Sequence, residues 1–86
     1  MIIFNKEEEN DRYHDWRREH PDGYVFNHFG GLIGEENIIH RASCYYLNRT
    51  NTNVEKVCST DLEKLVDYVK SIRGNSWTYC SVCGIH

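Results

Sequence analysis

The stretch Tyr79-Cys80-Ser81-Val82-Cys83 restricts the fold most, because it sets two cysteine thiols three positions apart near the end of the printed sequence. Two further cysteines, Cys44 and Cys58, stand earlier in the chain. At 86 residues a hydrophobic core alone gives marginal stability, and domains of this size usually add disulfides or a metal. The cysteines therefore predict one domain over residues 1–86 that a metal or covalent cross-links stabilise.

The composition favours a compartment in which these thiols stay reduced. No run approaches the roughly 20 apolar residues that cross a bilayer. The opening Met1-Ile2-Ile3-Phe4 is interrupted by charged residues too soon for the core of a signal peptide. We therefore expect a cytoplasmic protein without a membrane partner, where clustered cysteines bind metal more often than they pair. In a secreted protein the same cysteines would fit two disulfides.

Thiolates are the ligands that zinc prefers in closed structural sites. A C-x2-C turn can aim two sulfurs at one ion, so we predict a structural Zn²⁺ held by Cys44, Cys58, Cys80 and Cys83. The full spacing, C-x13-C-x21-C-x2-C, is not a tandem pair of such turns. His40 or His86 is therefore a credible substitute for one cysteine. Alternatively, Cys44 and Cys58 pack as small buried apolar residues.

The first half of the chain predicts a helix followed by a hairpin. Asn5 can cap a helix over residues 6–19, which must stop before Pro21 because the residue preceding proline avoids helical angles. Residues 24–29 have the composition of a strand, and a glycine-rich reversal follows them. Residues 38–47 are expected to form the longer partner strand.

The second half predicts one strand and one amphipathic helix. The strand is expected over residues 54–58. Thr60 and Glu63 have the spacing of a capping box, and Gly74 can end the helix that they open. An apolar stripe follows this helix at Leu62, Leu65, Val66, Val69 and Ile72. We expect an α+β fold with an N-terminal helix, a small antiparallel sheet (hairpin plus one strand), one amphipathic helix and a C-terminal zinc knuckle.

The sequence offers no convincing catalytic group. His40 and Cys44 share a strand face, but four residues of strand separate them by about 13 Å, too far for a nucleophile–base pair unless the strand bends. Cys80 and Cys83 precede no helix that would lower a thiol pKa, as a redox pair requires. We therefore predict that the protein is not an enzyme and has no catalytic residues.

A nucleic-acid surface, if present, has to be local. The net charge of −3 argues against broad, nonspecific attraction to DNA or RNA. Aromatic side chains beside polar groups can stack on a base and read its edges, and such residues gather around the turn at Pro21. The candidate surface comprises Trp16, His20, Tyr24, Asn27, His40 and Arg41. Trp16 and Tyr24 could instead pack the first helix onto the hairpin.

Four blocks of the sequence together resemble a known bacterial module. They are His20-Pro21-Asp22-Gly23-Tyr24-Val25-Phe26-Asn27, Ile39-His40-Arg41-Ala42-Ser43-Cys44, Lys56-Val57-Cys58 and the closing pair Cys80 and Cys83. The pattern is similar to a small domain at the start of bacterial restriction and defence proteins, often ahead of HNH-type nuclease domains. The resemblance covers residues 16–83 and implies one metal site at the four cysteine positions.

The resemblance also implies a DNA-associated accessory or reader role, which could include modified DNA. This sequence ends at the C-x2-C pair and holds no H-N-H set, so a nuclease or other effector would be a separate protein. Our first functional hypothesis is a non-enzymatic zinc-binding reader of nucleic acid in a defence or restriction context. The alternative is a protein–protein interaction module whose acidic N-terminal helix docks on a basic partner.

Overall fold

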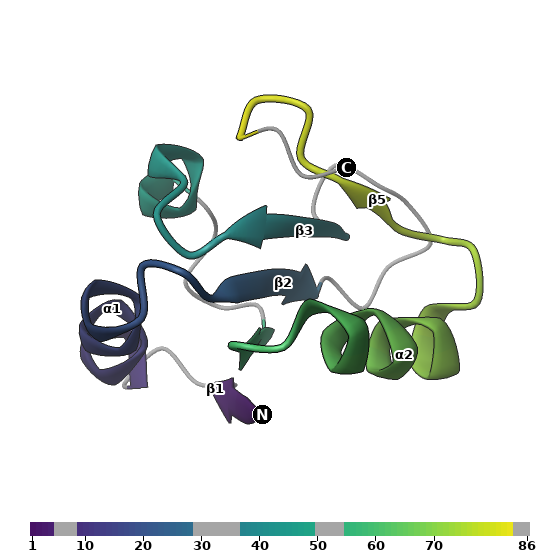
Figure 1. The fold of residues 1–86 in the computed structure, drawn as a ribbon, viewed down its shortest axis with the longest axis horizontal. Coiled ribbons are helices and arrows are strands. Elements are labelled where there is room, and N and C mark those ends of the chain that lie inside the picture. The colour runs from purple at the N-terminus through teal and green to yellow at the C-terminus, as the bar shows by residue number, and fades with distance from the viewer. Residues whose placement is uncertain (5–8, 29–36, 50–54, 84–86) are drawn as a thin grey trace.

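The computed structural model describes residues 1–4, 9–28, 37–49 and 55–83, and it shows a small α+β fold around one mixed sheet (Figure 1). The strands are β1 (Ile2–Phe4), β2 (Tyr24–His28), β3 (Ile38–Arg41), β4 (Glu55–Ser59) and β5 (Thr78–Tyr79). The helices are α1 (Asn10–Glu19), α2 (Leu62–Arg73) and a short 3₁₀ helix at Tyr45–Arg49. None of the helices in the described ranges is long and apolar enough to cross a membrane.

The sheet has the strand order β1-β4-β2-β3-β5. β2 is the middle strand, and its Val25 lies opposite His40 of β3 on one side and Cys58 of β4 on the other. The two strands of the predicted hairpin, β2 and β3, and the predicted third strand, β4, are thus present. β3 and β4 both pair antiparallel with β2. Two edge strands were not predicted: β1, antiparallel to β4, and β5, parallel to β3. The sequence predicted a purely antiparallel sheet, but the parallel pairing of β5 with β3 makes the sheet mixed.

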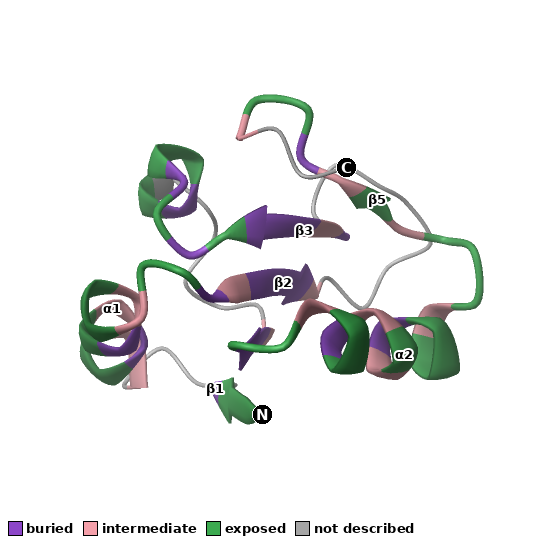
Figure 2. Cartoon of the chain, viewed as in Figure 1, coloured by how far each residue is buried: buried purple, intermediate pink, exposed green. Residues whose placement is uncertain are grey.

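Two core clusters lie on the two faces of the sheet, because successive strand residues point to opposite sides. Val25 belongs to the cluster that includes Tyr13 and Trp16 of α1, whereas the next residue, Phe26, packs with α2. The central strands are accordingly buried along most of their length (Figure 2). The predicted stripe of α2 faces this core except at Ile72, which is 40% exposed.

Both helices end close to their predicted C-terminal boundaries, but the start of α2 differs from prediction. α2 is capped by Asp61, whose Oδ1 accepts the backbone N–H of Lys64 at 3.1 Å, so the capping box centred on Thr60 was wrong by one position. Gly74 follows α2 with φ of +60°, which a residue with a side chain rarely adopts. The described part of α1 begins at Asn10, and its predicted start at residues 5–8 lies outside the described residues.

β3 ends at Arg41, six residues before the predicted end of that strand. The cause is its partner, because β2 begins at Tyr24, directly opposite Arg41. Beyond that point the chain turns: the Cys44 N–H donates to the Arg41 carbonyl at 2.9 Å, and the Leu47 N–H donates to the Cys44 carbonyl at 3.1 Å. This turn folds Cys44 back toward β3, so the separation of about 13 Å that a straight strand would give does not apply.

Candidate metal centre

A cluster of one imidazole and three thiols forms where the turn after β3 meets the turn after β5. His40, Cys44, Cys80 and Cys83 each place one ligand atom within 4.8 Å of the others. A tetrahedral zinc site with bonds of about 2.3 Å has edges of about 3.8 Å. The spacing of the four ligand atoms is therefore close to what one bound metal ion requires.

The sheet register brings the two halves of this cluster together. β5 runs parallel beside β3, with Ile39 opposite Tyr79. The pairing continues one residue further, because the Cys80 N–H donates to the Ile39 carbonyl at 2.9 Å. Cys80 consequently lies beside His40, and the turn at residues 81–83 carries Cys83 back to the same place.

Two arginines hold the ligand-bearing turns. The Arg41 backbone N–H donates to Cys83 Sγ at 3.4 Å, and Arg41 Nε donates to the Cys83 carbonyl at 3.0 Å. From α1, Arg17 Nε donates to the Ala42 carbonyl at 2.8 Å and Arg17 Nη2 to the Cys44 carbonyl at 2.9 Å. Contacts of this kind orient metal ligands, so the turns are positioned by the protein itself.

The environment of His40 suits a metal ligand. Its side chain is buried at 5% exposure, and its Nδ1 has no hydrogen-bond partner among the described residues. Burial, together with the charges of Lys56 and Arg17, lowers the pKa of His40 to about 4. The ring is then neutral near pH 7, the form in which histidine binds metals. Either ring nitrogen of a neutral imidazole can bind a metal, and Nδ1 is not already occupied by a hydrogen bond.

The three thiols influence one another. Burial tends to raise the pKa of Cys80, but the N–H groups of Cys83 and Val82 and the neighbouring thiols outweigh it, and the pKa is lowered. Burial raises the pKa of Cys83 to about 12. The hydrogen bond from the Arg41 N–H opposes this increase, whereas the Cys80 and Cys44 sulfurs add to it. Several thiolates this close repel unless a cation lies between them, so binding a metal would release protons.

Cys58 lies outside this cluster. It is fully buried on β4, packs in the cluster that contains Phe4 and Tyr13, and burial raises its pKa to about 12. Val25 on β2 separates it from His40, and two strand spacings amount to roughly 10 Å. The structure therefore brings together three of the four predicted cysteines with His40, as the histidine alternative allowed. The other histidine considered, His86, lies outside the described residues.

The residues proposed for a nucleic-acid surface do not form one exposed face. Trp16, Asn27 and His40 are buried, at 8%, 1% and 5% exposure. His20 and Tyr24 are half-buried, and the His20 ring stacks on Trp16 at 4.7 Å between centroids. Only Arg41 of the six is exposed. Trp16 packs α1 against the sheet, as the packing alternative described, whereas Tyr24 packs against the core cluster on the α2 side.

Exposed aromatic rings occur instead beside the His/Cys cluster. Tyr45 and Tyr46 directly follow Cys44, are 55% and 36% exposed, and stack at 4.6 Å between ring centroids. No protein-family model, curated protein or solved structure matches the chain. The His/Cys cluster and the surface that surrounds it are therefore the features of this chain that bear on its function.

Proposed function

We propose that this chain is a non-enzymatic zinc-binding module in which His40, Cys44, Cys80 and Cys83 hold one structural Zn²⁺. The proposal depends on one observation: four ligand atoms from these side chains lie within 4.8 Å of one another. Three cysteines and one histidine are an established ligand set of structural zinc. With four protein ligands the ion has no open position for water or substrate, which favours a structural role over a catalytic one.

The ligand set also distinguishes zinc from other metals. Thiolates disfavour magnesium and calcium, which bind oxygen ligands, and tetrahedral sites that combine sulfur and nitrogen are typical of zinc. The ion would join β3, the turn that follows it and the turn after β5. β5 has only two residues and lies at the edge of the sheet, so a metal bond would supply the anchorage that its short ladder does not.

Cobalt substitution tests the ligand set directly. We expect Co²⁺ added to metal-free protein to give the absorption spectrum of a tetrahedral ion with three thiolates and one nitrogen. His40→Cys should shift that spectrum to the four-thiolate form, whereas Cys58→Ala should leave it unchanged. A spectrum of an octahedral, oxygen-ligated ion, or one altered by Cys58→Ala, would contradict the proposed site.

For its biological role, we infer an accessory or reader module for nucleic acid, acting in a defence or restriction context with a separate effector. The stacked pair Tyr45 and Tyr46 supports this role, because exposed aromatic rings are platforms on which bases stack. The pair immediately follows the ligand Cys44, so a bound metal would fix its position. The defence context comes from the resemblance in sequence.

Binding to oligonucleotides tests the reader role. Single-stranded, duplex and modified DNA should be titrated at two salt concentrations. We expect the double variant Tyr45→Ala/Tyr46→Ala to weaken binding roughly tenfold or more, because one stacked base is worth about 1–3 kcal/mol. Ile72→Ala removes a similarly exposed apolar side chain from α2 and should have no effect. If the wild-type protein binds no form of DNA, the reader role fails and a protein partner is favoured.

A further inference from the structure

A basic cleft of about 400 Å³ lies between α1 and the segment that carries Cys44. Its walls are His14, Arg17, Arg18, Pro21, Ala42, Ser43 and Asn48. These residues include two arginines and no carboxylate, in a chain whose net charge is −3. The cleft between β1 and α1, about 290 Å³, differs because Asp15 and Glu19 contribute to its wall. Positive charge is thus concentrated in the cleft beside the metal cluster.

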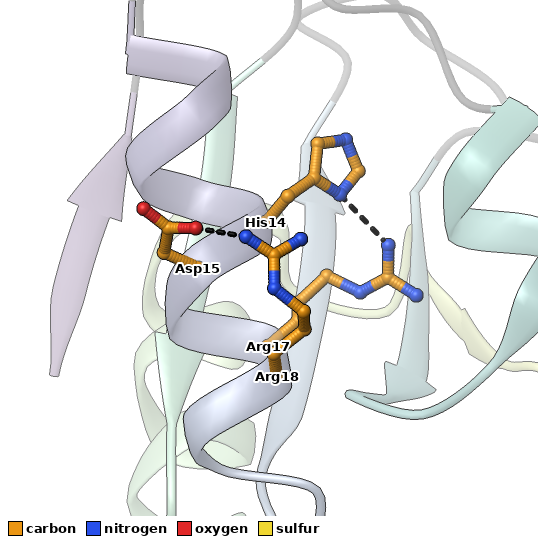
Figure 3. A network of polar contacts seen from close by, with 4 residues as sticks. All are labelled: His14, Asp15, Arg17 and Arg18. Atoms are coloured by element: carbon orange, nitrogen blue, oxygen red, sulfur yellow. Dashed lines mark hydrogen bonds and ion pairs between the residues drawn. The ribbon is translucent and has the colours of Figure 1, made fainter.

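Arg17 is held rigidly in the wall of this cleft. Its guanidinium donates to the Ala42 and Cys44 carbonyls, and Nη1 donates to Asn48 Oδ1 at 2.9 Å. Nη1 also donates to His14 Nδ1 at 3.0 Å (Figure 3). These four contacts use four of its five N–H bonds, leaving one on Nη2. Within the described residues no carboxylate pairs with Arg17. Its charge is therefore fixed in place without being neutralised.

Arg18 contributes a second charge that a ligand could recruit. It pairs with Asp15 one helical turn earlier (Figure 3), but both side chains are exposed, at 71% and 57%. An exposed pair of this kind contributes little to stability because water screens both charges. An anion in the cleft could draw the Arg18 guanidinium away from Asp15 at small cost.

His14 adds a neutral hydrogen-bond donor, and its lowered pKa reflects the positive charges around it. Its Nδ1 accepts from Arg17, which leaves the ring proton on Nε2. Burial lowers the pKa of His14, and the charges of Arg17, Arg18 and Lys56 lower it further, against a smaller opposing effect of Asp11. The ring therefore lies in a region of positive potential, where an anion would be favoured.

We propose that this cleft binds a phosphate group of a nucleic-acid backbone, with Arg17 and Arg18 supplying charge and His14 and the Ser43 hydroxyl supplying neutral donors. The inference rests on the reader role proposed above and assigns the phosphate contact within it. Ser43 and Asn48 bracket the stacked tyrosines on the same short segment. One segment, anchored by the ligand Cys44, would thus contribute to a phosphate-binding site and carry the stacked tyrosines beside it.

The test uses zinc-loaded protein and two probes. Inorganic phosphate is added first, and backbone amide shifts are followed by NMR. A single-stranded oligonucleotide is then titrated at several salt concentrations. Arg18→Ala is the test variant, and Arg12→Ala is its control, because Arg12 lies on the same helix, is 76% exposed and lines the other cleft.

We expect phosphate to shift the amides of Arg18 and Ser43 and to leave those of β1 unchanged. Arg18→Ala should weaken oligonucleotide binding several-fold and lower the slope of log K against log salt by about 0.7, the value for one phosphate contact on a single strand. Arg12→Ala should change neither. If the wild-type protein binds the oligonucleotide and the two variants weaken binding equally, the cleft is not the phosphate-binding site. The reader role would still hold in that case. If inorganic phosphate shifts these amides but the oligonucleotide does not bind, the cleft is a site for free phosphate and not for a nucleic-acid backbone.

Discussion

Cys83→Ser is expected to leave the chain unable to retain zinc and largely unfolded. Structural zinc binding contributes folding free energy on the order of 10 kcal/mol, comparable to the entire stability of a typical domain. Cys83 also anchors the C-terminal turn to Arg41 through its sulfur and its carbonyl. Circular dichroism and zinc content, measured on protein purified without added metal, should both show the loss.

Cys58→Ala is the matched control for this prediction. Cys58 is fully buried in the apolar cluster on the α1 side of the sheet, so its loss removes packing and no metal ligand. We expect a cost of about 1–3 kcal/mol, typical of a core substitution, with zinc retained. A folded, metal-free Cys83→Ser protein would contradict the structural role of the metal.

Trp16→Ala should lower the free energy of unfolding by about 3–5 kcal/mol, the usual cost of removing a buried tryptophan. Trp16 is 8% exposed and stacks on His20. The chain also packs closely against it, because a Cβ added to Gly23 would come within 2.7 Å of the Trp16 ring. Urea unfolding of the zinc-loaded protein measures the change.

The control for Trp16 is again Arg12→Ala, which removes an exposed side chain from the same helix and should change stability by less than about 0.5 kcal/mol. The pair of variants also separates the two interpretations of Trp16. If Trp16→Ala unfolds as the wild type does but loses DNA binding, the tryptophan is a surface contact and its assignment to the core is wrong.

Local sequence patterns were enough to predict the elements that they encode directly. The apolar stripe of α2 fits the 3.6-residue period, and Leu65 and Val69 are fully buried as that period requires. Pro21 ends α1 as its fixed geometry demands. The C-x2-C spacing placed Cys80 and Cys83 together because a short turn connects them. In each case the deciding residues are neighbours in sequence.

The membership of the His/Cys cluster depended on distant pairings that no local pattern reveals. β3 stops at Arg41 because β2, its partner, begins at Tyr24. That early stop returns Cys44 to His40, and the insertion of β2 between β3 and β4 removes Cys58 from the site. β1 and β5 were missed because three and two residues are too few to show the period of a strand.

Zinc content by elemental analysis, together with a free-thiol count, tests the central claim most directly. We predict one zinc per chain in the wild-type protein and in Cys58→Ala, and loss of zinc to a mild chelator in His40→Ala. In the folded, zinc-loaded protein Cys58 should react slowly with a thiol reagent because it is buried, and the other three cysteines because they bind the metal. Wild-type protein without zinc, or a Cys58→Ala protein that loses it while His40→Ala keeps it, would contradict the proposed metal centre.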